Sequence, residues 1–284
     1  MFVPKKDKNN YCCFNGKIVP ANSALICLDD LGILRGYGVF DVMKTVNGKI
    51  FLFDEHFKRL SDSADYLGAR LPAGKKEIEE AIKKLISKNK IKQASIRIVL
   101  TGGRSADAMH FDSKTPTFYI LVSEFRPLKE ELFKNGVKLA TVNRGRDMAE
   151  IKTTNYITAV KNINERQKKE NFFEIIYVSN GLVLEASTSN FFAFIGGKLV
   201  TPKDNILKGI TRNLIIKLAK KEFEVEEREL KMDELNLVAE AFIAATNKDI
   251  VPVVQIDNLK MGDGKPGKNT QKFMQIFEEF VKNY

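Results

Sequence analysis

The strongest constraint on the fold is a series of short apolar runs separated by tight turns in the second half of the chain. The turns include Asn180-Gly181 and Gly196-Gly197. Such pairs favour hairpins between apolar runs because their residues adopt positive φ at little cost. The sequence therefore predicts a β-meander whose strands are 174–179, 182–186, 190–195 and 198–201.

Further elements are predicted on both sides of the meander from apolar periodicity. Asp54 is the expected N-cap of the first long helix, and Gly68 is its expected stop. A helix over 157–169 is expected to bury Ile157, Val160 and Ile163. The other predicted strands are 17–20, 39–46, 50–53, 94–101, 115–124, 137–143, 224–229, 241–245 and 251–255, and the other predicted helices are 75–89, a short one ending at Gly136, 211–223, 231–237 and 269–284.

The best domain boundary is Phe125-Arg-Pro-Leu, where proline interrupts the pattern after a compact first half. We expect a small α+β domain over 1–126 and a larger domain over 127–284, an α+β fold class. The larger domain would carry Lys152, which is taken up below.

Composition excludes several classes of protein. The 284 residues are 44% hydrophobic, with a net charge of +10, and the lysines are spread along helices without an arginine-rich aromatic block. We therefore expect anionic small-molecule substrates and no nucleic acid. No apolar run has membrane-spanning length and the N-terminus does not resemble a signal peptide, so we expect no membrane contact and a cytoplasmic protein.

Cysteine and histidine are too few for a metal site. Three cysteines (Cys12, Cys13 and Cys27) make a disulfide framework or a zinc site an unfavoured reading. With only two histidines, His56 and His110, a multi-histidine metal site is excluded. His56 is expected on the surface of its helix.

Two charged residues carry the main functional hypothesis. Lys152, in Ile151-Lys-Thr-Thr-Asn-Tyr156, lies where a strand gives way to a helix, and Glu185 ends a later strand. Either one alone would be read as a surface charge. Together they are what a pyridoxal phosphate enzyme needs, an amine that forms the Schiff base and a carboxylate that keeps the pyridine nitrogen protonated.

A candidate phosphate site lies at the start of the helix after Leu207. The free amides of Ile210 and Thr211 and the Thr211 hydroxyl would face an anion there. Arg59 and Thr246 could add a guanidinium and a hydroxyl. By contrast, the phosphate-loop-like segment Gly262–Asn269 ends in Asn instead of Ser or Thr and contains Pro266. We interpret it as a turn that caps the last helix.

Five segments in order resemble the class IV aminotransferases, the fold-type IV pyridoxal phosphate enzymes. The resemblance runs from about Phe14 to Phe280. Its segments are Arg35-Gly-Tyr-Gly-Val-Phe-Asp, Glu55-His-Phe-Lys-Arg59-Leu, Ile151-Lys152-Thr-Thr-Asn-Tyr156, Leu184-Glu185-Ala-Ser-Thr-Ser-Asn190 and Leu207-Lys-Gly-Ile-Thr-Arg212.

The resemblance implies the roles of the site residues. Lys152 would bind pyridoxal 5'-phosphate and move the proton, and Glu185 would pair with the pyridine nitrogen. Tyr156 would approach the phenolic oxygen. It also implies a small α+β domain, a larger domain with a barrel-like β core, and a homodimer whose partner subunit completes the site. The phosphate would be held by Arg59, Ile210, Thr211 and Thr246.

Departures from the family patterns bear on the substrate. The spacing Lys152-Thr-Thr-Asn is similar to the D-amino-acid and lyase branches of the family, and Arg35 is similar to an arginine of some D-amino-acid enzymes. Tyr156 and Phe40 are similar to the branched-chain branch. A substrate carboxylate needs a cation. The candidates are Arg35, which we rank first, Arg97, Arg104 and His110.

The expected function is transfer of an amino group between an amino acid and a 2-oxo acid. D-amino acids are slightly favoured, and L-branched-chain amino acids come next. One alternative is an aminodeoxychorismate lyase that releases pyruvate and 4-aminobenzoate. The other is a non-catalytic basic binding protein of the same fold.

Overall fold

The computed structural model describes residues 10–284, which divide into two compact units. The first unit runs through Arg126 and also includes Ile151–Asn155. The second contains Pro127–Glu150 and Tyr156–Tyr284. The segment that carries Lys152 thus packs with the first unit, although it follows Arg126 in sequence. Residues 1–9, where no signal-like apolar run was found, lie outside the described part.

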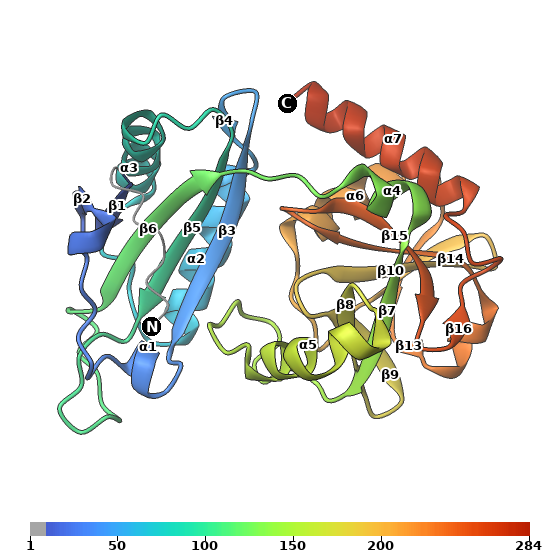
Figure 1. Ribbon diagram of the computed structural model, residues 1–284, viewed down its shortest axis with the longest axis horizontal. Helices are drawn as coiled ribbons and strands as arrows, with labels where there is room; N and C mark the ends of the chain where they lie inside the picture. The colour runs from blue at the N-terminus through green and yellow to red at the C-terminus, as the bar shows by residue number, and fades with distance from the viewer. Residues whose placement is uncertain (1–9) are drawn as a thin grey trace. The chain divides into compact units, whose positions relative to one another are not determined.

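The first unit is built on a six-stranded sheet with the strand order β2-β1-β6-β5-β3-β4. Helices α2 and α3 pack on one face of this sheet, and the apolar side chains between them form the core (Figure 1). The elements are β1 (Tyr11–Phe14), β2 (Lys17–Pro20), η1 (Ala21–Ser23), α1 (Leu31–Leu34), β3 (Gly38–Val46), β4 (Lys49–Ile50), α2 (Phe53–Tyr66), α3 (Lys75–Lys88), β5 (Ala94–Thr101) and β6 (Thr117–Glu124).

Helix α2 differs from the prediction at its start and on its buried face. Its N-cap is Leu52 in a left-handed conformation, so Asp54 lies inside the first turn and the predicted N-cap is wrong. Asp54 still suits the positive end of the helix. Gly68, with φ +69°, follows the end of the helix as expected. His56 is fully buried, not on the surface, because Asp41 of β3 offers it a carboxylate partner.

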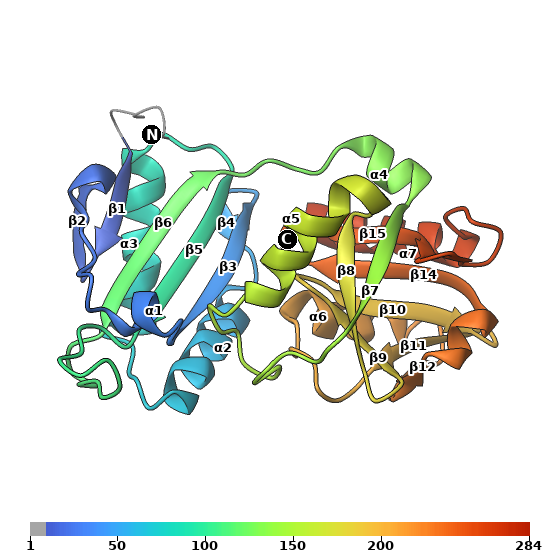
Figure 2. The ribbon, with the colours of Figure 1, turned by 60° about the horizontal axis from the view of Figure 1, so that its bottom comes forward.

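The second unit is built on a ten-stranded mixed sheet whose inward side chains form one core. Its path is β12-β11-β10-β14-β15-β7-β8-β9-β13, with β16 on β15. Helix α7 packs on α6, β14 and β15, outside the curved sheet (Figure 2). The elements are α4 (Glu130–Asn135), β7 (Val137–Asn143), α5 (Ile157–Glu170), β8 (Glu174–Ser179), β9 (Leu182–Ala186), β10 (Asn190–Ile195), β11 (Lys198–Pro202), α6 (Ile210–Ala219), β12 (Val225–Arg228), β13 (Leu230–Lys231), η2 (Asp233–Leu237), β14 (Val238–Ala245), β15 (Asp249–Ile256), β16 (Leu259–Lys260) and α7 (Lys268–Lys282).

The predicted inward face of α5 is wrong at Ile157 and Val160 and is confirmed at Ile163. Ile157 is 75% exposed and Val160 is 56% exposed. The buried stripe of this helix instead passes through Ala159 and the partly buried Ile163, which are four residues apart and pack against the β8 side of the sheet. The helix therefore presents branched apolar side chains to solvent.

The turn before α7 caps that helix, as predicted from the sequence. The Glu240 carboxylate of β14 accepts hydrogen bonds from the amides of Asn269 (3.1 Å) and Thr270 (2.7 Å). Gly267, the N-cap, is packed so closely on Glu240 that a Cβ would collide with its carboxyl carbon. A carboxylate thus fills the helix end where a phosphate would have to bind.

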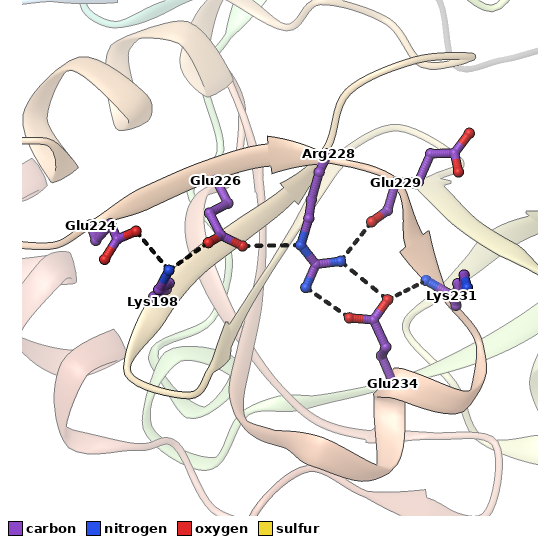
Figure 3. Close-up of polar contacts among 7 residues, drawn as sticks. All are labelled: Lys198, Glu224, Glu226, Arg228, Glu229, Lys231 and Glu234. Atoms are coloured by element: carbon purple, nitrogen blue, oxygen red, sulfur yellow. Dashed lines mark hydrogen bonds and ion pairs between the residues drawn. The ribbon is translucent and has the colours of Figure 1, made fainter.

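A surface network of charges joins β11 to the parallel strand β12 and to η2 (Figure 3). Lys198 pairs with Glu224 (2.7 Å) and Glu226 (2.8 Å), and Arg228 pairs with Glu226 (3.0 Å) and Glu234 (2.7 Å). The Glu224 and Glu226 carboxylates raise the pKa of Lys198. These contacts tie the edge of the sheet to its neighbouring loop.

Within residues 10–284, no helix is both long and apolar enough to span a membrane.

Candidate active site

Lys152 is held at the edge of the first unit's sheet. The backbone of its segment runs beside β3, where the Phe40 amide donates to the Lys152 carbonyl (2.9 Å) and the Thr154 amide donates to the Gly38 carbonyl (2.9 Å). The Thr154 hydroxyl also donates to the Gly36 carbonyl (2.9 Å). These bonds fix the backbone on both sides of the lysine, so its side chain projects from a rigid support.

Two cations of this unit contact the Phe40 ring. The Lys152 Nζ lies 4.9 Å from the ring centroid, and the Arg97 guanidinium lies 5.0 Å from it. Val42 of β3 pairs with Arg97 of β5, so Phe40 and Arg97 are diagonal neighbours on one face of the sheet. This face is opposite to the one that packs on α2.

The other predicted carboxylate-binding residues are exposed and make local contacts. Arg104 is held by Asp29, with Nη2 2.8 Å from Oδ2, and its side chain is 71% exposed. The Nδ1 of His110 is 2.6 Å from Asp107, whose hydrogen bond and charge raise the pKa of the histidine. Arg35 donates to the Leu34 carbonyl (2.9 Å). Of the four candidate cations, Arg97 is the one that the structure places on the Phe40 ring, which Lys152 also contacts. The contacts of Arg35, Arg104 and His110 are with other residues.

Glu185 is buried in the second unit beside an arginine that sequence reasoning missed. The Arg146 Nη1 lies 3.0 Å from Glu185 Oε1, and the Asn190 Nδ2 lies 3.4 Å from Oε2. Tyr177 is electrostatically coupled to Arg146 and Tyr156, and its burial raises its pKa to about 12. Arg146 lies in an irregular polar stretch without periodicity, so no sequence signal could have found it. The glutamate is thus a buried, charge-compensated carboxylate.

Helix α6 begins with a group of donors suited to an anion. Its N-cap is Gly209, and no side chain caps it. Ile210 and Thr211 form the first turn, where backbone amides have no intrahelical partner. The hydroxyls of Thr211 and Thr246 are 3.3 Å apart. These amides and hydroxyls, at the positive end of a ten-residue helix, fit the phosphate group of pyridoxal phosphate.

Arg59 is fixed by a carboxylate that the sequence reasoning did not assign. Its Nε donates to Asp41 Oδ2 (2.8 Å) and its Nη2 to Asp41 Oδ1 (2.8 Å). Asp41 alternates with Val39 and Met43 on the core face of β3. A charged residue at an apolar position of a strand pattern was a usable signal, because a buried carboxylate requires a partner.

Comparison with known proteins identifies the family. Residues 38–256 match the model of the family described as "Amino-transferase class IV". A Methanocaldococcus jannaschii protein named "Putative branched-chain-amino-acid aminotransferase" is 32% identical, over 93% of this chain and 94% of its own. The D-alanine aminotransferase of Bacillus licheniformis is 30% identical, over 95% and 98%.

Solved structures agree with the fold and with the cofactor. A branched-chain amino acid aminotransferase from Escherichia coli superposes with a TM-score of 0.89 at 26% identity, covering 97% of this chain and 95% of that one. A second branched-chain enzyme, solved with pyridoxamine 5'-phosphate, gives a TM-score of 0.88 at 25% identity, covering 98% and 96%. The predicted α+β fold is confirmed, and so is the predicted cofactor. The chain belongs to the class IV aminotransferases and is a pyridoxal-phosphate-dependent enzyme.

Proposed function

We propose that the enzyme moves an amino group between an amino acid and a 2-oxo acid, with Lys152 and Glu185 as its catalytic residues. When bound, pyridoxal phosphate supplies an electron-withdrawing ring that stabilises negative charge at the substrate Cα. The Lys152 Nζ would hold the cofactor and, when free, would carry the proton between Cα and C4′. The observation that supports this best is the rigid support of Lys152 along β3.

Glu185 keeps the pyridine nitrogen protonated. Arg146, 3.0 Å from it, compensates the buried carboxylate, which would pair with the protonated nitrogen. Tyr156 is the proposed partner of the phenolic oxygen. Arg59, Ile210, Thr211 and Thr246 are the proposed phosphate ligands.

Arg97 is our proposed ligand of a substrate carboxylate, ahead of Arg35, Arg104 and His110. It shares the Phe40 ring with Lys152, whereas Arg104 and His110 are each engaged by a neighbouring aspartate. Phe40 would limit the space beside the substrate.

D-amino acids remain the first proposed substrates and L-branched-chain amino acids the second. The spacing of Lys152-Thr-Thr-Asn and the D-alanine aminotransferase relatives support the first. The branched-chain relative and the structural neighbours support the second.

A homodimer in the cytoplasm belongs to the same proposal. Both units expose apolar side chains of a kind that dimer interfaces cover, among them Leu25 (77%) and Leu28 (85%) in the first unit and Ile157 and Val160 in the second. The cysteines are free thiols, as in reducing compartments.

Two measurements test the catalytic proposal. Borohydride reduction of the cofactor-loaded enzyme, followed by digestion and mass spectrometry, should place the tag on Lys152; a tag on another residue contradicts the assignment. Single D- and L-amino acids are then mixed with the enzyme and 2-oxoglutarate. We expect D-alanine and D-glutamate to give oxo acids. Fast reaction of L-leucine alone reverses the substrate ranking, and release of 4-aminobenzoate from aminodeoxychorismate identifies a lyase.

A further inference from the structure

Behind Arg59 lie two buried side chains, Asp41 and His56, that the proposed function does not use. Asp41 comes from the core face of β3, and His56 and Arg59 are three residues apart on α2, so both reach the same carboxylate. The His56 Nδ1 is 2.7 Å from Asp41 Oδ1. The Asp41 and His56 side chains are fully buried, and that of Arg59 is 14% exposed.

The Asp41 carboxylate is saturated with donors. Oδ1 accepts from the Val42 amide (2.7 Å), from His56 and from the Arg59 Nη2, and Oδ2 accepts from the Arg59 Nε. Burial by itself would raise the pKa of this carboxyl, but Arg59 and His56 outweigh it and bring the pKa below its ordinary value. Asp41 is therefore ionised and accepts from each donor.

His56 completes the group without adding a charge. Burial lowers its pKa, against the opposing effect of Asp41, so the ring is neutral near pH 7. Because an ionised carboxylate can only accept, the Nδ1 of His56 carries the proton and donates it. Nε2 is then unprotonated, and it is buried without a hydrogen-bond partner among residues 10–284.

This arrangement leaves one defined part of Arg59 for a ligand. A bidentate bond through Nε and Nη2 fixes the plane of the guanidinium, and Nη1 has no partner among the described residues. A freely rotating arginine would lose side-chain entropy on binding an anion, whereas a fixed one has lost it already. An electrostatic effect opposes this gain. The negative charge of Asp41 partly cancels the positive charge of Arg59 and so weakens its attraction for a phosphate.

We infer that Asp41 and His56 are positioning residues, which hold the Arg59 guanidinium in the orientation that binds the cofactor phosphate. The inference rests on the proposed function of Arg59. It implies that fixing the orientation outweighs the cancelled charge, so neutralising Asp41 weakens phosphate binding instead of strengthening it.

The test compares a cofactor that has the phosphate with one that lacks it. Full-length protein is stripped of cofactor, and the dissociation constants of pyridoxal 5'-phosphate and of pyridoxal are measured by absorbance. For Asp41→Asn we expect the constant for pyridoxal phosphate to rise about tenfold while that for pyridoxal stays near the wild-type value. His56→Gln, which can still donate one hydrogen bond, should show a smaller rise of the same kind.

Asp30→Asn is the matched control. Asp30 is also fully buried in the first unit and also accepts several hydrogen bonds, from the Gly32 amide and the hydroxyls of Thr101 and Thr117. Its replacement should destabilise the unit without changing the ratio of the two dissociation constants. An equal change of that ratio in Asp30→Asn and Asp41→Asn overturns the inference.

A double-mutant cycle with Arg59→Lys separates positioning from a general structural role. If Asp41 acts through Arg59, Asp41→Asn changes pyridoxal phosphate binding far less in the Arg59→Lys background. Additive losses, equal losses for the two cofactors, or tighter phosphate binding by Asp41→Asn each overturn the inference. Failure of the proposed role of Arg59 is distinguishable, because Arg59→Lys alone would then leave the ratio of the two dissociation constants at its wild-type value.

Discussion

At the scale of single residues, the Glu185 carboxylate is a charge in the protein interior, where the loss of hydration makes an ion costly. It is 3% exposed, and Arg146 compensates it. Removing one partner of a buried ion pair leaves the other uncompensated. The buried charge at this position therefore depends on tertiary contacts and not on the strand β9 that carries it.

Replacing that carboxylate should affect the reaction more than the fold. We expect Glu185→Gln to lower kcat by roughly 100-fold or more, because an amide does not hold a proton on the pyridine nitrogen. Steady-state kinetics with saturating cofactor measure the change. Glu240→Gln, a change of the same kind at a glutamate that caps α7, is the control and should leave kcat unchanged. A Glu185→Gln enzyme with wild-type kcat contradicts the assignment.

His56 makes stability depend on pH. Burial lowers its folded-state pKa below the ordinary 6.5, so the unfolded chain takes up its proton at a higher pH than the folded chain does. This contribution to the free energy of unfolding is complete above about 6.5 and is lost as the pH falls toward the folded pKa. We expect His56→Gln to show a shallower dependence in urea unfolding below that pH. Equal slopes for the two proteins count against the assignment.

At the scale of elements, helix ends are completed by residues far away in sequence. Glu240 of β14 supplies the cap of α7 from 29 and 30 residues away. The apolar face of α7, with Phe273 and Phe277 buried, could be read from its periodicity. The identity of the cap could not, because the nearby residues give no hint that β14 reaches the helix end.

The cap should be worth about 1 kcal/mol, in the range measured for N-cap side chains. We expect Glu240→Ala to lower the free energy of unfolding by that amount, measured by urea titration, and Glu240→Gln to lose less. The half-buried surface network at Arg228 and Glu226 is the comparison (Figure 3). Changes there should have smaller effects that shrink further with added salt. A salt-independent loss for Arg228→Ala would contradict this contrast.

At the scale of the whole molecule, each unit exposes branched apolar side chains that the proposed homodimer would cover. The solvent-exposed face of a helix rarely carries neighbouring apolar side chains such as Ile157 and Val160, yet α5 exposes both. The proposed homodimer accounts for this exposure.

Charges introduced on these surfaces should therefore reduce dimerisation. We expect Leu28→Glu and Val160→Glu to shift the protein toward the monomer in sedimentation velocity, because each places an unpaired charge in an apolar contact. Leu237→Glu, at another exposed apolar residue, is the control. A wild-type protein that sediments as a monomer contradicts the proposal.

The sequence alone determined the parts that depend on local physics. The hairpins at Asn180-Gly181 and Gly196-Gly197 could be predicted because glycine turns and alternating apolar runs act over a few residues. Lys152 and Glu185 could be proposed from the sequence because the expected chemistry needs a particular pair of residue types. The five ordered segments identified the family.

Only the tertiary structure decided where charges are compensated and which faces are covered. His56 is buried because Asp41, on a strand that precedes its helix, supplies the partner that no local pattern reveals. Arg146 reaches Glu185 across the second unit, and the exposed face of α5 follows from how that helix packs on its sheet. Burial and ion pairing depend on contacts between residues distant in sequence, so neither propensity nor periodicity contains them.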